Sequence, residues 1–453
     1  MNNDSLQDWL ERLEKLHPVE IDLGLARITE VAHSLDLLPL AQPVITVAGT
    51  NGKGSTVAVL EAVLTAQGLR CGTFTSPHFL RFNERIRVAQ EDASDADIVL
   101  AFEAIESARG EISLTYFEFA ALAALLVFRA HQPDVVILEV GLGGRLDAVN
   151  IVEPSLCVIT RIDLDHQGWL GDTREQIAVE KAGILRRGVP VVVSDQDPPA
   201  SLRRAIQDIG AAPALFLGEE FSVCPVESGL FGQWQVTLQT GQGKPRTLPA
   251  FEMASLLPQN VAAAVQAALA GGFDVSNEQL QIALDSLVVT GRRQHFERDG
   301  VSYVLDVAHN PAAVEALLEY LQSSCCNGRR LAVFSAMKDK DLKKMLSPAV
   351  SEFDAWMLAD QPGNARSATA KEVMAVLADL DVEMISSSKN LRQAFARAQQ
   401  LAAPGDTIVV FGSFTTVAAV LNKFLPKRPL SELAHSEPGH LDEGHSHTLQ
   451  EAR

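Results

Sequence analysis

A short glycine-rich stretch, AGTNGKGS at residues 48–55, carries the side chains best suited to phosphate chemistry. A β-branched apolar run precedes it, and apolar residues at helical spacing follow it. Strand, loop and helix in this order point backbone N–H groups at a bound anion, while Lys53 neutralises charge and Ser55 or Thr56 can hold magnesium. The stretch departs from the common G-x-x-x-x-G-K-[ST] pattern, because two fewer residues separate its glycines and Gly54 follows the lysine. A turn that only caps a helix is the alternative, but the pattern favours a nucleotide site.

Three further side chains could complete a metal site. Glu139 ends the apolar run VVILE, where a carboxylate is unfavourable unless it is paired or bound to a metal. The later segment DLDHQGWLGDTREQIAVEKAGIL supplies His166 and Lys181. Carboxylate, imidazole and hydroxyl groups together can hold magnesium. Each residue alone could be an ordinary ion-pair or core group, but their order after the loop favours function.

Alternating apolar runs and helical patterns indicate the scaffold that positions these residues. Runs such as PVITVAG, DVVILEVG and SLCVITRID predict a parallel sheet covered on both faces by helices. Ligands of such sheets lie at the carboxyl ends of the strands. The alternation restarts at about residue 298. We therefore predict an α/β protein in which a P-loop-type, mostly parallel sheet domain precedes a smaller Rossmann-like α/β domain.

The predicted boundaries follow changes in composition. They place the first domain at residues 1–291, a linker at 292–297 and the second domain at 298–425. Residues 196 to about 250 are irregular and predict a small antiparallel excursion. Residues 426–453 are polar and aperiodic, so we expect a disordered tail. Four histidines of this tail could bind a metal adventitiously, namely His435, His440, His445 and His447.

Composition excludes several classes of protein. The chain of 453 residues has 38 basic and 57 acidic residues, which argues against a nucleic-acid binder. It contains no apolar run of the roughly 18 residues that a membrane span needs. The acidic amphipathic start, DSLQDWLERLEKL, is unlike a signal peptide. Five cysteines without a C-x-x-C pair suit reduced thiols, so we expect a cytoplasmic protein.

A set of motifs in fixed order resembles a known family. AGTNGKGS, TSPH, TYFEF, EVGLGGRLDAVN, DHQGWLG, EKAGI, GRRQ and DVAHNP are similar to motifs of the folylpolyglutamate synthase family of the Mur-ligase superfamily, especially its bacterial bifunctional members. The resemblance covers about residues 8 to 424. It implies ATP-dependent ligation of L-glutamate to dihydropteroate and to reduced folates through an acyl phosphate. It also accounts for the short loop with an extra glycine, which this superfamily uses.

The resemblance also implies roles for individual residues. Those implied to bind ATP are Thr50, Asn51, Gly52, Lys53, Gly54, Ser55, Asn260, Arg292, Asp306 and His309. Those implied to bind two magnesium ions are Ser55, Ser76, Glu139, His166 and Lys181. Lys181 would act as a carbamate, and an unmodified Lys181 in an ion pair is the alternative. Lys53, His166 and Lys181 form the catalytic set. Arg293 is a departure, because the family often has an aromatic residue there.

Three segments resemble the pterin site of the family: Asp22, Leu23, Gly24 and Leu25; Thr115, Tyr116, Phe117 and Glu118; and Leu146, Asp147 and Ala148. Phe117 could stack on a flat ring, and Asp147 could accept hydrogen bonds from its amino groups. Core packing and helix capping are the other readings of these segments.

Other activities remain open at this point. A monofunctional folylpolyglutamate synthase would use only reduced folates. A Mur-type ligase for a sugar-nucleotide peptide would need a further N-terminal domain, and only some 40 residues precede the loop. A non-catalytic ATP-binding module would leave Glu139, His166 and Lys181 without a purpose. We expect a monomer that binds neither nucleic acid nor membrane.

Overall fold

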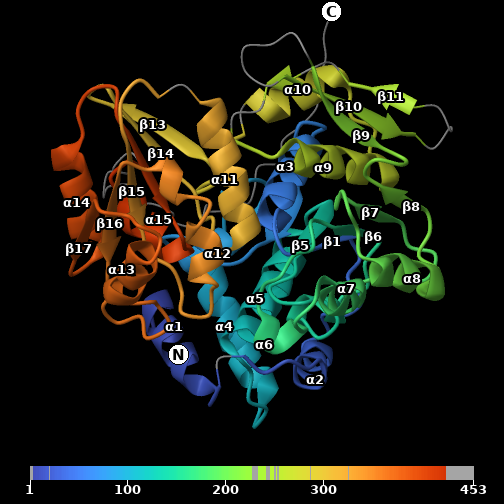
Figure 1. Cartoon of the computed structure of the whole chain (residues 1–453). Coiled ribbons are helices and arrows are strands. Elements are labelled where there is room, and N and C mark those ends of the chain that lie inside the picture. The colour runs from blue at the N-terminus through green and yellow to red at the C-terminus, as the bar shows by residue number, and fades with distance from the viewer. Residues whose placement is uncertain are drawn as a thin grey trace, which may run out of the picture.

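A computed structural model provides the structure of the chain (Figure 1). It describes residues 4–19, 21–226, 233–240, 245–248, 251–252, 255–285, 287–324 and 326–424. The predicted tail at 426–453, with its four histidines, lies outside the described residues. Within the described part of the chain, no helix is long and apolar enough to cross a membrane.

An eight-stranded sheet forms the larger part of the molecule. Its strands run in the order β4-β3-β2-β5-β1-β6-β7-β8, and all neighbours are parallel except at β3 and β4. The central strands are apolar on both faces because helices cover both. The bounds are β1 Val44–Ala48, β2 Cys71–Phe74, β3 Ile86–Val88, β4 Glu91–Asp92, β5 Val135–Glu139, β6 Leu156–Ile159, β7 Val191–Val193 and β8 Ala214–Phe216.

Two groups of helices cover this sheet. Helices α3 (Lys53–Thr65), α9 (Pro258–Ala270) and α10 (Asn277–Asp285) share one apolar core with one face of the sheet. The opposite core holds α1 (Leu6–Leu16), α2 (Ala26–Ser34), α4 (Asp95–Arg109), α5 (Tyr116–His131), α6 (Gln167–Leu170), α7 (Arg174–Ala182) and α8 (Ala200–Ile209). Helix α5 is almost wholly apolar, which is the pattern of a helix surrounded by protein.

The predicted antiparallel excursion is present but shorter than expected. It consists of β9 (Ser222–Val226), β10 (Gln233–Gln239), β11 (Pro245–Thr247) and β12 (Phe251–Glu252), all paired through β10. Its first expected part, from residue 196, instead forms α8 and β8 of the large sheet. The sequence ASLRRAIQDI explains this, because its apolar residues fall on one helical face and pack on the core.

A six-stranded sheet forms the second α/β unit. Its order is β13-β14-β18-β15-β16-β17, parallel except for β13. Its elements are β13 Gln294–Arg298, β14 Val301–Leu305, α11 Pro311–Ser323, β15 Arg330–Phe334, α12 Leu342–Leu346, β16 Ala355–Ala359, α13 Ala370–Ala378, β17 Ile385–Ser388, α14 Leu391–Leu401, β18 Thr407–Phe411 and α15 Phe414–Leu421. Strand β13 overlaps the predicted linker 292–297, and the exact domain boundaries stay predictions.

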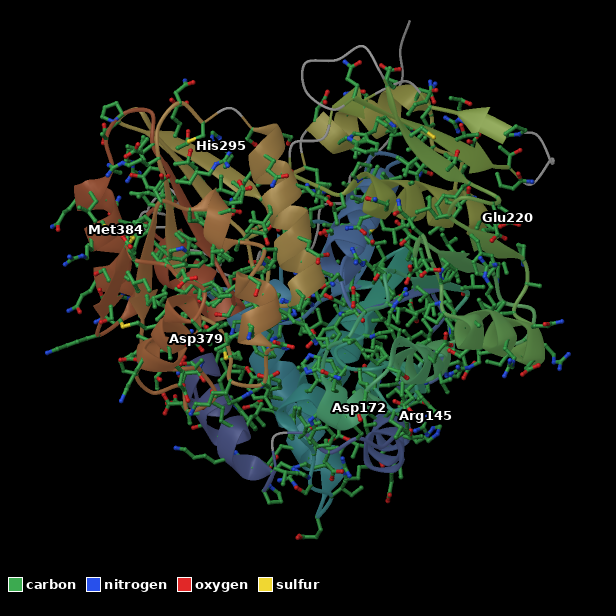
Figure 2. The ribbon with its side chains drawn as sticks, viewed as in Figure 1. Arg145, Asp172, Glu220, His295, Asp379 and Met384 are labelled. Atoms are coloured by element: carbon green, nitrogen blue, oxygen red, sulfur yellow. The ribbon has the colours of Figure 1, made fainter. Side chains whose placement is uncertain are left out.

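The two sheet units lie side by side, with the start of α11 turned toward the glycine loop before α3. Figure 2 places the side chains of Met384 and Glu220 on opposite flanks, one on each unit, away from the junction. The predicted α/β class is confirmed. The carboxyl ends of β1, β5, β6 and β7 all lie at this junction.

Candidate active site

The glycine loop between β1 and α3 has a shape that only glycine allows at two positions. Gly49 and Gly52 have φ of 151° and 97°. A Cβ atom at Gly49 would overlap the hydroxyl of Thr160, and one at Gly52 would lie 2.5 Å from Oδ1 of Asn260. Gly52 is the N-cap of α3, so the first amides of this helix have no intrahelical acceptor. They form an anion-binding helix start.

The turn at 161–163 is fastened to this loop. The amides of Thr50 and Asn51 donate to the carbonyl oxygen of Arg161 at 2.8 and 3.3 Å. The Thr50 hydroxyl donates to the carbonyl of Asp163 at 3.1 Å and accepts from its amide at 3.0 Å. A phosphate contact by Thr50 would have to replace one of these bonds. The amides best placed for phosphate therefore begin at Gly52.

Two lysines converge on the loop. Lys53 Nζ donates to the carbonyl oxygens of Gly49 and Thr50 at 3.1 and 3.2 Å. Lys181 Nζ, which is buried, donates to Gly49 O at 2.8 Å. Burial, and then the positive charge of Lys53, lower the pKa of Lys181 to about 7. Burial also lowers the pKa of Lys53, against the opposing charge of Glu139.

Glu139 stands at the end of β5 with its carboxylate buried beside the start of α3. Its oxygens would lie 3.7 Å from a Cβ placed on Gly54. Among the described residues, only the amide of Ser76 donates a hydrogen bond to it, at 3.1 Å. Burial raises its pKa, while Lys53 and the Ser76 amide oppose that shift. This carboxylate lacks an ion-pair partner in the described chain, so a divalent cation would suit it.

His166 lies at the start of α6 beside Asp165. Burial lowers the pKa of His166 to about 4, although Asp165 opposes this, so the imidazole is neutral at pH 7 and can ligate a metal. Oxygen and nitrogen atoms of Asp165, His166 and Asp339 lie within 4.8 Å of one another. Asp165 and His166 belong to the larger sheet unit, and Asp339 belongs to the second unit.

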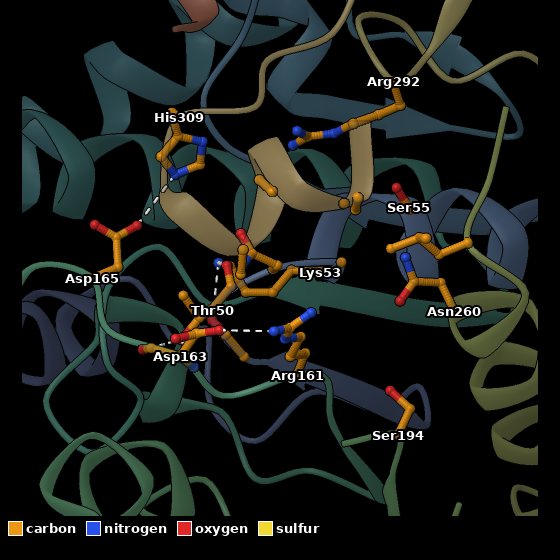
Figure 3. Close-up of a pocket in the computed structure, with 18 of the residues that line it drawn as sticks. Thr50, Lys53, Ser55, Arg161, Asp163, Asp165, Ser194, Asn260, Arg292 and His309 are labelled. Atoms are coloured by element: carbon orange, nitrogen blue, oxygen red, sulfur yellow. Dashed lines mark hydrogen bonds and ion pairs between the residues drawn. The ribbon is translucent and has the colours of Figure 1, made fainter. Parts of the chain in front are cut away.

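Asp165 links the two units. It accepts from His309 Nε2 at 3.2 Å (Figure 3). It also forms an ion pair with the buried ammonium of Lys340. Burial acts to raise the pKa of Asp165, but the His309 hydrogen bond and the nearby positive charges hold it well below its usual range. Asn51 and Asn310 add a second link, exchanging side-chain hydrogen bonds of 3.2 and 2.9 Å.

The second unit presents its own charged residues to the loop. Asp306 accepts from the amides of Arg293 and Ala308 at 2.8 and 2.7 Å. The guanidinium of Arg292 lies 5.3 Å from the ring centre of Phe414. The guanidinium of the neighbouring Arg293 donates to the carbonyl of Ser255 at 3.2 Å.

A cavity of about 650 Å³ brings these groups together. Every residue assigned to ATP or magnesium by resemblance lines it: Thr50, Asn51, Gly52, Lys53, Gly54, Ser55, Ser76, Glu139, His166, Lys181, Asn260, Arg292, Asp306 and His309. Figure 3 shows Arg292 and His309 on one side of the loop and Arg161 and Ser194 on the other. The individual roles stay predictions, but the residues occupy one place.

A second cavity of about 960 Å³ adjoins the first. The two share Ser76, Pro77, Gly141, Leu142, His166, His309 and Phe414. Ten of the eleven residues predicted to bind the pterin line it, namely Asp22, Leu23, Gly24, Thr115, Tyr116, Phe117, Glu118, Leu146, Asp147 and Ala148. Leu25 lies outside both linings, immediately before α2.

Several of these residues also hold the fold. Thr115 and Glu118 form the capping box of α5, and Glu118 pairs with Arg27 at 3.2 Å. Asp147 accepts from the amides of Leu142 and Val149 at 2.8 and 3.1 Å. Burial raises the pKa of Asp147 to about 6 despite these bonds. The capping alternative and a ligand role are thus compatible.

Sequence reasoning missed Asp165, Asn310 and Lys340, and it missed the turn at Arg161. Asp165 could have been noticed because it directly precedes His166 in LDH. Lys340, in the run KDKD, gave no comparable signal, since its partner lies 175 residues away.

Comparisons with known proteins agree with this geometry. Residues 47–279 match the Mur ligase middle domain, and residues 291–414 match the Mur ligase glutamate ligase domain. The chain is 40% identical to the dihydrofolate synthase/folylpolyglutamate synthase of Escherichia coli over 92% of this chain and 94% of that protein. It is 37% identical to the Haemophilus influenzae protein of the same name, over 91% and 96%.

Solved structures give the same picture. Escherichia coli FolC in complex with DHPP and ADP superposes with a TM-score of 0.86 at 39% identity, covering 93% of this chain and 98% of that chain. A bifunctional folylpolyglutamate synthase/dihydrofolate synthase with Mn, AMPPNP and L-glutamate bound gives 0.83 at 38% identity, with the same coverage.

Proposed function

Because this chain belongs to the Mur ligase family, among the dihydrofolate synthase/folylpolyglutamate synthases, we propose that it joins L-glutamate to dihydropteroate and to reduced folates with ATP. It is an ATP-dependent acid–amino-acid ligase. The observation that carries this function is the junction of the two cavities. The glycine-loop cavity and the cavity lined by the pterin segments adjoin and share Ser76, His166 and His309.

The reaction has two steps, phosphorylation of the carboxylate and formation of the amide. An oxygen of the substrate carboxylate attacks the γ-phosphorus of ATP, and ADP leaves. The neutral α-amine of glutamate then attacks the acyl phosphate, an amide bond forms, and phosphate leaves while the amine loses a proton. Both partners of the first step are anionic, so Lys53 and the helix amides from Gly52 onward must offset their repulsion.

Magnesium would supply further positive charge between the carboxylate and the phosphates. Glu139 fits such an ion because it is a buried carboxylate without an ion-pair partner in the described chain. Ser55 and Ser76 would complete that shell. His166, neutral at pH 7, would hold a second ion together with a modified Lys181.

The modification proposed for Lys181 is a carbamate. The neutral amine attacks carbon dioxide, a nitrogen–carbon bond forms, and one proton is released to solvent. A pKa of about 7 makes the neutral amine available at physiological pH. The unmodified alternative is the amine that donates to Gly49 O.

For the remaining ligands, Asn260, Arg292, Asp306 and His309 would contact the nucleotide. Phe117 and Asp147 would meet the face and the amino groups of the pterin. Both cavities form within one chain, so we further propose that the monomer is active.

Purified enzyme with ATP, magnesium and labelled glutamate tests the function, with dihydropteroate and tetrahydrofolate offered separately. Label should enter both products. Incorporation into tetrahydrofolate alone would leave a monofunctional synthase. ATP binding without incorporation into either substrate would leave a binding module.

A further inference from the structure

One end of the nucleotide cavity has no role in the function proposed so far. It is formed where β6 and β7 end, by Arg161 and Asp163 after β6 and by Ser194 directly after β7. Figure 3 shows Arg161 and Ser194 on the side of the cavity away from His309, with Asn260 above Ser194.

The position of Arg161 is fixed relative to the loop. Its carbonyl oxygen receives the amides of Thr50 and Asn51, and the Thr50 hydroxyl exchanges two hydrogen bonds with the backbone of Asp163. The turn and the phosphate loop therefore form one hydrogen-bonded unit. The backbone of Arg161 therefore keeps its place beside any ligand that binds to the loop.

The Arg161 side chain forms an ion pair but stays half exposed. Its guanidinium pairs with Asp163 at 3.1 Å, and the two side chains are 50% and 25% exposed. A single carboxylate restrains the guanidinium without using all its donors or its flat faces. The remaining surface of Arg161 lines the cavity.

The order of the strands gives the direction in which ATP must lie. The cavity with the pterin segments opens on the side of β5 and β2, at Gly141 and Ser76. The γ-phosphate must face that side, because it is transferred to the substrate there. The nucleoside must then extend the opposite way across β1, over β6 and β7, where Asn260 of α9 also lies.

Ser194 supplies an independent sign of a ligand at this end. Its residue is 4% exposed, and its hydroxyl has no hydrogen-bond partner among the described residues. Buried hydroxyls without partners are unfavourable. A group that enters the cavity beside Ser194 would relieve that cost.

We propose that Arg161, restrained by Asp163, binds the nucleoside half of ATP by stacking its guanidinium on the purine, with Ser194 at the edge of the base. This inference rests on the proposed function, since it takes ATP as the ligand. It makes Arg161 a determinant of nucleotide affinity and leaves the phosphoryl chemistry to Lys53 and the helix amides.

Calorimetric titration of Arg161→Ala and Arg161→Lys with MgADP tests the stacking. Both variants should bind about fivefold to thirtyfold more weakly than the parent, because lysine keeps the charge but lacks the planar group. Inorganic tripolyphosphate, which has no base, should bind the parent and Arg161→Ala equally. Arg203→Ala, which removes an exposed arginine paired with Glu219 outside both cavities, is the matched control.

Each other result would overturn the inference. Full recovery of affinity in Arg161→Lys, with tripolyphosphate weakened by Arg161→Ala, would make Arg161 a phosphate ligand. Unchanged MgADP affinity in Arg161→Ala would remove it from the site. Steady-state assays separate this from the proposed function: Arg161→Ala should raise KM for ATP and leave KM for glutamate unchanged. A parent enzyme that binds MgADP but never incorporates glutamate would instead refute the proposed function.

Discussion

Lys53 and Lys181 donate to the same carbonyl oxygen, that of Gly49, at 3.1 and 2.8 Å. Burial, and then repulsion from the Lys53 ammonium at the shared acceptor, lower the pKa of Lys181 to about 7. The lysine proposed to meet the phosphates thus helps to keep the other lysine partly neutral. We therefore expect the charge of Lys53 to influence formation of the carbamate proposed for Lys181.

Replacing Lys53 with methionine should lower turnover about 100-fold to 1,000-fold, because one charge contact of this kind is lost during phosphoryl transfer. Turnover with saturating dihydropteroate and glutamate measures this. The circular dichroism spectrum should match the parent. Turnover within a few-fold of the parent would exclude Lys53 from the mechanism.

The same substitution should raise the pKa of Lys181, because one source of repulsion disappears while burial remains. Carbon-13 NMR with labelled bicarbonate would follow the carbamate signal against pH. Its midpoint should move to higher pH in Lys53→Met. An identical midpoint in the two proteins would show that the lysines are not coupled.

Lys181→Ala should abolish ligation, and small carboxylates such as acetate should restore part of it by occupying the vacated ligand position. In the parent, activity should fall as the pH drops through about 7, since the protonated amine cannot capture carbon dioxide. Removal of dissolved carbon dioxide should have the same effect at constant pH. Full activity in a sample without a carbamate resonance would leave Lys181 as a hydrogen-bonding lysine.

Asp147→Asn should change how stability depends on pH. The folded protein raises the pKa of Asp147 from 3.8 to about 6, so the native state holds its proton more tightly than the unfolded chain. The contribution of Asp147 to the free energy of unfolding is therefore full below about pH 4 and is lost as the pH rises through 6. Urea unfolding at several pH values should show that the free energy of unfolding of Asp147→Asn rises relative to that of the parent as the pH increases from about 4 to 6. A difference that is constant with pH would contradict this.

The ion pair of Asp165 with Lys340 should behave as a buried pair in a double-mutant cycle. Asp165→Asn alone leaves the Lys340 ammonium with Asp339, which is 3.3 Å away and 45% exposed, as its carboxylate partner. The loss should therefore stay below the roughly 3 to 5 kcal/mol that is typical when a buried charge loses its partner altogether. Adding Lys340→Met should recover part of that loss. If the two substitutions have additive effects on the free energy of urea unfolding, the contact between Asp165 and Lys340 contributes no coupling energy between the two sheet units.

Local sequence predicted those parts of the site that local physics dictates. The β-branched run before a glycine turn fixed β1, the loop and α3, and an acidic residue ending an apolar strand indicated Glu139. The fold class followed from the same alternation. Each of these signals lies within a few residues of the structure it specifies.

Contacts between segments far apart in the chain could not be predicted from local sequence. The Thr50 hydroxyl donates a hydrogen bond to the carbonyl of Asp163, 113 residues away, and Asp165 forms a hydrogen bond with His309, 144 residues away. Motif spacing does not encode such pairings, because they depend on how strands order in the sheet and how the two units meet. For the same reason, α8 and β8 were mistaken for part of the excursion, since joining the edge of a sheet depends on the strand already there.

The wall of the pterin cavity has a consequence for inhibitor escape. Thr115 and Glu118 line that cavity and also cap α5, whose side chains fill the core of the larger unit. A substitution there that repels an inhibitor also removes a helix cap, typically worth about 1 kcal/mol, and at Glu118 it leaves Arg27 with Asp22 as its carboxylate partner. An antifolate anchored on these two residues would therefore meet a surface on which resistance mutations weaken the protein that carries them.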